Sequence, residues 1–261
     1  MSTASTTGTA STEALAAVTA NFRQYLMGWG GTRREDGGLD RYRSGLATPQ
    51  FNGVVRIRSL EALDGAVATA RTELAGVPWW WWAGPDSPEG TSAALARHGA
   101  VPLGALPLMV RPVDHAPAPQ DPPAGLRVEA VASPDRLAGL VGTYRTSMGI
   151  AGELESGLVR SEAERADNAD IVRLAAVLDG DVVGTTVVIT AHGVAGIFLV
   201  HVAESHRRRG IGAALTTAAL RVAHERGTGL AALLASPAGE PLYRRFGFTT
   251  VAEYRLFALP D

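Results

Sequence analysis

The chain has 261 residues, 46% of them hydrophobic and 19% charged, which is enough for one large or two small globular domains. Its formal net charge of −2 at pH 7 lacks the basic excess of proteins that bind nucleic acid, so no such partner is expected. It contains no cysteine, which excludes disulfides, a thiolate nucleophile and cysteine-ligated metal, and which fits a cytoplasmic protein.

The N-terminal half carries few motifs. Residues 1–12 are rich in Ser, Thr and Ala without the basic and apolar segments of a secretory signal, so we expect a disordered tail. Residues 79–82 are four tryptophans between Pro78 and Pro85, which predicts a strand with two rings on each face. The rings form either a buried strand or an aromatic wall for a hydrophobic or cationic ligand. No apolar stretch reaches the ~20 residues that span a bilayer, so no membrane association is expected.

A proline-rich segment at 114–125 predicts a linker between a first domain at 13–113 and a second at 126–261. In the second domain, strands and helices alternate, and Ser133 followed by proline marks a helix start. The predicted elements are a strand at 126–131, a helix from 134, a helix at 154–167, strands at 171–178, 182–190 and 194–202, a helix at 207–226, a strand at 230–235, a short helix at 240–246 and a strand at 248–259.

The most informative segment leads from the apolar strand at 194–202 into the next helix. Residues 207–212 read Arg-Arg-Arg-Gly-Ile-Gly. The first amides of a helix have no partner inside it, and the helix dipole favours negative charge there. Glycines let a phosphate approach the backbone, and arginines donate paired hydrogen bonds to its oxygens. The segment therefore predicts a site for a phosphate-bearing cofactor, and the alternative is a solvated basic helix cap.

Two motifs resemble those of the GNAT acetyltransferase superfamily. Arg207-x-x-Gly-x-Gly after an apolar strand resembles its acyl-CoA-binding motif, and Tyr243-x-x-x-Gly-Phe resembles its second motif. The resemblance covers about residues 126–261. It implies an α+β fold, the GNAT acyl-CoA N-acyltransferase fold, with acetyl-CoA as co-substrate.

The same resemblance implies roles for individual residues. A bulge at Val200 to Val202 would offer backbone groups to the pantetheine arm, and the amides of residues 208–213 would hold the pyrophosphate. Tyr243 would protonate the departing thiolate, the alternative being a core aromatic. The residues implied in binding acetyl-CoA are Val200, His201, Val202, Arg207, Arg208, Arg209, Gly210, Ile211, Gly212, Ala213 and Ser236, the last of which is otherwise a plain turn serine.

The general base is unassigned. The positions that carry it in many superfamily members are Gly196 and Phe198 here, and neither accepts a proton. His201 faces away from these two by strand alternation unless a bulge reverses it. Glu153 and Glu155 lie where the acceptor binds in the superfamily, or are surface charges. Ordered water, or an acceptor that is already neutral, is the remaining route.

The end of the first half repeats the end of the second. Residues 95–112 align with residues 243–260, with Leu108 against Leu256 and Leu95 in the place of the tyrosine. This is similar to the tandem-GNAT arrangement, in which a degenerate half, here 13–113, packs beside an active one. Chance similarity of two short helix–turn–strand units is the alternative.

We therefore expect a tandem-GNAT enzyme that transfers an acetyl group from acetyl-CoA to a primary amine of a small molecule, by direct attack in a ternary complex. No metal is expected, because the six histidines lack ligand spacing and no HExxH occurs. Two alternatives stay open: another donor, such as a longer acyl-CoA or an aminoacyl carrier, and a non-catalytic acyl-CoA-binding regulatory module. A homodimer also stays open.

Overall fold

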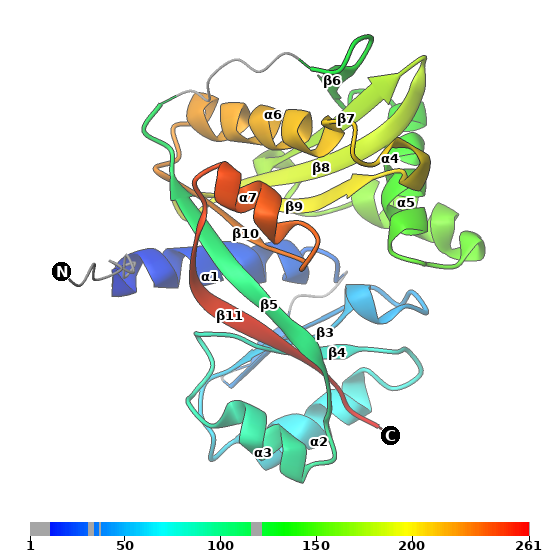
Figure 1. Ribbon diagram of the computed structural model, residues 1–261. Coiled ribbons are helices and arrows are strands. Elements are labelled where there is room, and N and C mark those ends of the chain that lie inside the picture. The colour runs from blue at the N-terminus through cyan, green and yellow to red at the C-terminus, as the bar shows by residue number, and fades with distance from the viewer. Residues whose placement is uncertain (1–10, 31–33, 37, 116–121, 261) are drawn as a thin grey trace, which may run out of the picture.

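The computed structural model of the protein describes residues 11–30, 34–36, 38–115 and 122–260 (Figure 1). The helices are α1 (Thr12–Met27), α2 (Leu63–Glu73), α3 (Thr91–Arg97), α4 (Pro134–Ser147), α5 (Glu155–Ala163), α6 (Ile211–Glu225) and α7 (Glu240–Arg245). The strands are β1 (Arg34–Asp36), β2 (Leu39–Arg43), β3 (Asn52–Ile57), β4 (Trp80–Ala83), β5 (Val101–Pro112), β6 (Arg127–Ala130), β7 (Ile171–Leu178), β8 (Asp181–Ala191), β9 (Val194–Val202), β10 (Leu230–Leu234) and β11 (Thr249–Ala258).

These strands form one mixed sheet in the order β1-β2-β3-β4-β11-β5-β10-β9-β8-β7-β6. Period-two alternation gives the sheet two apolar faces. Along β8, Val187 and Ile189 pack with α1 and α4, whereas Val188 between them packs with α6. Figure 1 shows α2 and α3 at one end of the molecule, α4 to α6 at the other, and α1 between them.

The two halves exchange their last strands. The last strand of the first half, β5, pairs with β10 of the second half, and the last strand of the second half, β11, pairs with β4 of the first. The two exchanged strands also pair with each other, antiparallel, in the middle of the sheet. The sequence boundary at 114–125, of which 116–121 lie outside the described residues, therefore does not divide the sheet into two self-contained pieces.

The pairing of β5 with β11 has the two-fold symmetry of a repeat. Leu108 pairs with Ala252, and Gly104 pairs with Leu256. The difference in residue number that relates Leu108 to Leu256 in the sequence alignment of the two halves also relates Gly104 to Ala252. Exchanging the two halves therefore converts each of these pairs into the other. The rest of the register, including its two shifts, obeys the same offset. The repeat inferred from the sequence is thus a structural repeat.

Most predicted elements of the second half are present within one or two residues. The helix expected at 154–167 ends at Ala163, and the helix expected from Arg207 begins at Ile211. The second difference arises because Arg208 and Gly210 have φ angles of 64° and 82°, which no helix accommodates.

In the first half, residues 1–10 of the expected tail lie outside the described residues. Ser11 caps α1 by accepting a hydrogen bond from the Ala14 amide at 3.1 Å, and Thr12 begins the helix. The tryptophans lie two on each face, as the alternation predicts: Trp79 and Trp81 pack with α2 and α3, and Trp80 and Trp82 lie toward α1. Three of the rings are buried and Trp80 is half-buried, which favours the reading of a buried strand.

Candidate functional site

A cleft of about 650 Å³ lies where β9 ends, α6 begins and the connection from β10 reaches α7. Eleven of the twelve residues predicted for the site line it, and Arg209 alone does not. The lining residues are Ser147, Val200, His201, Val202, His206, Arg207, Arg208, Gly210, Ile211, Gly212, Ala213, Ser236, Ala238, Gly239, Pro241, Leu242, Tyr243 and Arg245.

The turn before α6 presents a run of unpaired backbone donors. Ala214 is the first residue of this helix whose amide donates within the chain, to the Gly210 carbonyl at 3.0 Å. The six amides before it, of residues 208–213, donate to no atom of the described part of the chain. Unpaired amides at a helix start attract anions, and the helix dipole adds to that attraction.

Local backbone conformation aims these amides into the cleft. Gly210 has a φ of 82°, which a glycine adopts without strain. Arg208 has a φ of 64°, which costs a residue with a side chain about 1–2 kcal/mol. Of the four non-glycine residues described with positive φ, Asp179 and His192 lie in hairpin turns. Arg208 lines the cleft, and Leu199 directly precedes Val200, which also lines it.

The side chains of the cleft are basic, with no Asp or Glu among those that line it. Arg207 bends back so that its Nε donates to the Val202 carbonyl at 3.3 Å, which fixes the end of β9. Arg208 and Arg245 form no ion pair with the described residues, so their charges face the cleft uncompensated. This arrangement fits a ligand with several negative charges.

The strand β9 carries a bulge, one or two residues before the expected place. Its pairing with β8 shifts between Phe198 and His201, where Leu199 has a φ of 49°. Two buried threonines of β8 hold this conformation: Thr185 Oγ1 donates to the Leu199 carbonyl at 2.7 Å, and Thr186 Oγ1 donates to the Phe198 carbonyl at 3.2 Å. Sequence reasoning missed both threonines. Consecutive threonines on the neighbouring strand were the only signal for them.

Beyond the cleft, β9 and β10 diverge. Their parallel pairing joins residues 194–196 to residues 230–232 and goes no further. Two parallel strands that separate leave backbone groups of both strands without partners in the sheet, and an extended ligand between them can pair with those groups. The ends of β9 and β10 next to the cleft are therefore not paired with each other, and we call this interruption of the pairing between the two strands the slot.

Tyr243 lines the cleft from α7. Its side chain is buried, with its ring edge-on to Phe248, and its hydroxyl makes no hydrogen bond with the described residues. Burial raises the pKa of Tyr243 to about 12, because the phenolate loses its hydration. The phenol therefore stays protonated at neutral pH and can donate to an anion in the cleft.

None of the base candidates is well placed. Burial, together with the nearby Arg207, lowers the pKa of His201 to about 4, so its imidazole is neutral but weakly basic. Glu155 is paired with Arg145 at 2.9 Å, and neither Glu153 nor Glu155 lines the cleft. Gly196 is required where it stands, because a Cβ there would overlap the Asn21 side chain.

The first half lacks these features at its equivalent positions. Its helix α2 begins after Ala62, whose φ is −85°, and Leu63 already donates within the chain, to Leu60. A fully buried Leu95 stands in the place of Tyr243. The turn before α2 thus has no left-handed residue, and the position in α3 that is equivalent to Tyr243 carries no hydroxyl.

Among the residues that the structure describes, no group of three or more His, Asp or Glu residues is arranged to hold a metal ion. No helix in that part of the chain has the length and apolarity needed to cross a membrane.

Part of the chain matches a known protein family. Residues 142–248 match the model of the acetyltransferase (GNAT) family. No curated protein matches the chain. A GCN5-related N-acetyltransferase from Kribbella flavida has the same fold at 22% identity, with a TM-score of 0.71 over 94% of this chain and 96% of that one.

Two further structures share the fold. A GCN5-related N-acetyltransferase from Sphaerobacter thermophilus matches at 20% identity and a TM-score of 0.62, over 85% of this chain and 76% of that one. A tandem GNAT protein from the clavulanic acid biosynthesis pathway matches at 16% identity and a TM-score of 0.58, over 94% and 96%. The last similarity spans both halves of the present chain.

Proposed function

We propose that the protein is an N-acetyltransferase, because residues 142–248 match the model of the GNAT acetyltransferase family and the chain has the fold of a tandem GNAT protein. It transfers the acetyl group of acetyl-CoA to a primary amine of a small molecule, by direct attack in a ternary complex. The observation that carries the proposal is the run of six unpaired amides, at residues 208–213, in a cleft lined by arginines and by a protonated tyrosine.

The turn before α6 fits the pyrophosphate of a CoA thioester. Six amides, a glycine at the point of closest approach and the charges of Arg207 and Arg208 match a group with two adjacent phosphates. The bulge at Leu199 and the slot between β9 and β10 would hold the extended pantetheine arm by backbone hydrogen bonds. The chemistry that the thioester supplies is an activated acyl carbon.

The protein's own part in the reaction is placement and proton supply. In the proposed step the amine nitrogen bonds to the acyl carbon as the carbon–sulfur bond breaks. Tyr243 stands as the hydrogen-bond and proton donor to the departing sulfur, and the amine loses its proton to water. His201 is a poor proton acceptor for this step, since its pKa of about 4 lies far below that of an alkylammonium, ~10.

One observation favours a second candidate, a non-catalytic acyl-CoA-binding module. The cleft is lined by no carboxylate, and the histidine on β9, His201, is weakly basic. Release of free CoA from acetyl-CoA in the presence of a panel of amines separates the two candidates. Catalytic release supports the enzyme, whereas tight binding without release with any amine supports the module.

The site itself is tested by calorimetric titration with acetyl-CoA. Gly210→Asp puts a carboxylate among the unpaired amides, at a left-handed position that Asp tolerates better than most residues. We expect micromolar binding by the unmodified protein and a loss of at least ~10-fold in the variant, about 1.4 kcal/mol. Arg209→Ala is the matched control, because Arg209 does not line the cleft, and its affinity should stay within about twofold.

Absence of binding by the unmodified protein, or equal affinity in Gly210→Asp, would remove the basis of the proposal. A cytoplasmic location, a small-molecule acceptor and a homodimer remain predictions from the sequence.

A further inference from the structure

A small void lies at the inner end of the slot between β9 and β10. It measures about 10 Å³, and its walls include Gly196 and Phe198 of β9 and residues 232–234 of β10. Two residues further along the strands, Val200 and Ser236 line the large cleft. The void therefore lies about 7 Å further into the protein along both strands, on the line that leads from the phosphate-binding turn through the slot.

Much of the void's wall comes from the other half of the chain. Val18, Asn21 and Phe22 of α1 and Leu108 of the exchanged strand β5 complete it. Asn21 fixes the helix in place, because its Nδ2 donates at 3.0–3.1 Å to three carbonyls, two at the end of β8 and one at the start of β9. The half that lacks the phosphate-binding turn thus closes the inner end of the slot.

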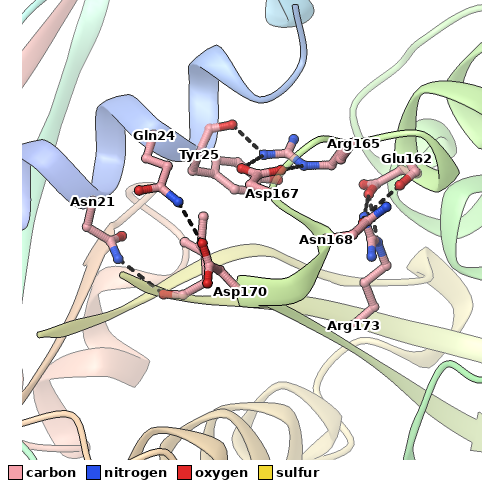
Figure 2. A network of polar contacts seen from close by, with 10 residues as sticks. Asn21, Gln24, Tyr25, Glu162, Arg165, Asp167, Asn168, Asp170 and Arg173 are labelled. Carbon is pink, nitrogen blue, oxygen red and sulfur yellow. Dashed lines mark hydrogen bonds and ion pairs between the residues drawn. The ribbon is translucent and has the colours of Figure 1, made fainter. Parts of the chain in front are cut away.

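The wall is rigid. Phe198 stacks on Tyr25 with ring centroids 3.7 Å apart, and the guanidinium of Arg165 lies 4.7 Å from the centroid of the Tyr25 ring. Arg165 is completely buried, donates to the Tyr25 carbonyl at 2.7 Å and pairs with Asp167 at 2.9 Å (Figure 2). Figure 2 shows Asn21 and Tyr25 side by side on α1, reaching toward the second half. Displacing Phe198 would therefore break its stacking on Tyr25, a residue that the buried Arg165 holds in place.

The size of the void sets a limit on what can enter. A cavity of about 10–15 Å³ on this measure holds a group the size of one water molecule. A methyl group is close to that limit, whereas a chain of two or more further methylenes needs the aromatic wall to move. Forcing methylenes into a packed site is unfavourable, because it displaces side chains from their preferred rotamers.

We propose that this void receives the methyl end of the donor's acyl group, and that α1 restricts the donor to acetyl-CoA. Phe22 and Phe198 are the residues that set the chain length. The inference rests on the proposed function, and it gives the first half a role in donor selection.

The test is calorimetric titration of the full chain with CoA and with acetyl-, propionyl-, butyryl- and hexanoyl-CoA. The unmodified protein should bind acetyl-CoA at least ~10-fold more tightly than butyryl-CoA. Phe22→Leu and, separately, Phe198→Leu should raise butyryl-CoA affinity relative to acetyl-CoA by ~10-fold. Ala232→Val fills the void instead, and it should weaken acetyl-CoA binding while CoA binding stays within about twofold.

Phe22 is buried, so if Phe22→Leu does not fold, Phe198→Leu and Ala232→Val still decide the matter. Equal affinity of the unmodified protein for acetyl- and hexanoyl-CoA, or an unchanged ranking in the folded variants, overturns the inference and leaves the proposed function standing. Failure of CoA and acetyl-CoA to bind at all overturns both.

Discussion

The role of Tyr243 gives the sharpest test of the proposed chemistry. Tyr243→Phe removes one hydroxyl and keeps the ring that packs edge-on against Phe248, so the fold should be unchanged. Burial raises the pKa of the phenol to about 12, about two units above its ordinary value, so ionising it costs about 2.7 kcal/mol more than in water. The donor form is therefore present at every pH below about 12.

The same pKa limits the size of the effect. A thiol has a pKa of ~8.5, so complete proton transfer from this phenol to a thiolate is uphill by roughly 3.5 units, or about 5 kcal/mol. We therefore expect Tyr243 to act mainly by a hydrogen bond that strengthens as charge develops on sulfur. Tyr243→Phe should lower kcat by ~10²-fold, the lower end of the range for general acids, with acetyl-CoA affinity within about twofold of the unmodified protein.

The assay is release of free CoA across pH 6–10, with calorimetric affinity measured in parallel. Tyr144→Phe is the matched control, because the Tyr144 hydroxyl is buried without a partner among the described residues and does not line the cleft. Undiminished turnover in Tyr243→Phe would refute the assigned role. An alkaline loss of activity near pH 10 that disappears in the variant would refute the raised pKa.

Three further predictions concern stability. Residues 122–260 expressed alone should show no cooperative unfolding by circular dichroism, because β10 loses its partner β5 and β11 loses its partner β4. Co-expression with residues 1–121 should restore cooperative unfolding. A cooperative transition of the fragment alone would contradict this prediction. Arg165→Met should lower the free energy of unfolding, measured by urea denaturation, by about 3–5 kcal/mol, because it leaves the Asp167 carboxylate buried and uncompensated. Adding Asp167→Asn should recover part of that stability. Additive losses in the double variant would argue against an energetic coupling of Arg165 and Asp167. The pKa of His201 is lower in the folded chain, so unfolding takes up a proton between about pH 6.5 and 4, and the free energy of unfolding should fall by about 3 kcal/mol as pH falls through that window. His201→Gln should flatten this pH dependence, whereas substitution of an exposed histidine, His224→Gln, should not. An unchanged pH dependence in His201→Gln would exclude His201 as its source.

The features that the sequence predicted well are local ones. Strand alternation, the Ser133 cap and the glycine-containing turn are each specified by residues a few positions apart, so pattern and backbone preference suffice to place them. The cleft residues follow for the same reason, because a strand, a turn and a helix start bring 200–213 together without help from the rest of the chain. The repeat was also readable, since it preserves a helix–turn–strand pattern.

The place of α1 and the location of the bulge were not readable. The helix α1 has an ordinary amphipathic pattern, and nothing in it indicates that Asn21 will bind carbonyls about 170 residues away. The bulge depends on two threonines of the neighbouring strand, and the register that brings them beside Leu199 is a property of the sheet.

By itself, the sequence determined the turn of unpaired amides before α6, the order of strands and helices in the second half, and the loss of that turn in the first. These depend on unpaired amides, on backbone angles that glycine permits and on hydrophobic period, all of which act within about ten residues. Only the tertiary structure decided that the halves exchange β5 and β11 and that α1 closes the slot beside Phe198. Strand partners and packed faces are chosen by burial and shape across the whole chain, and those energies have no signature in any short stretch of residues.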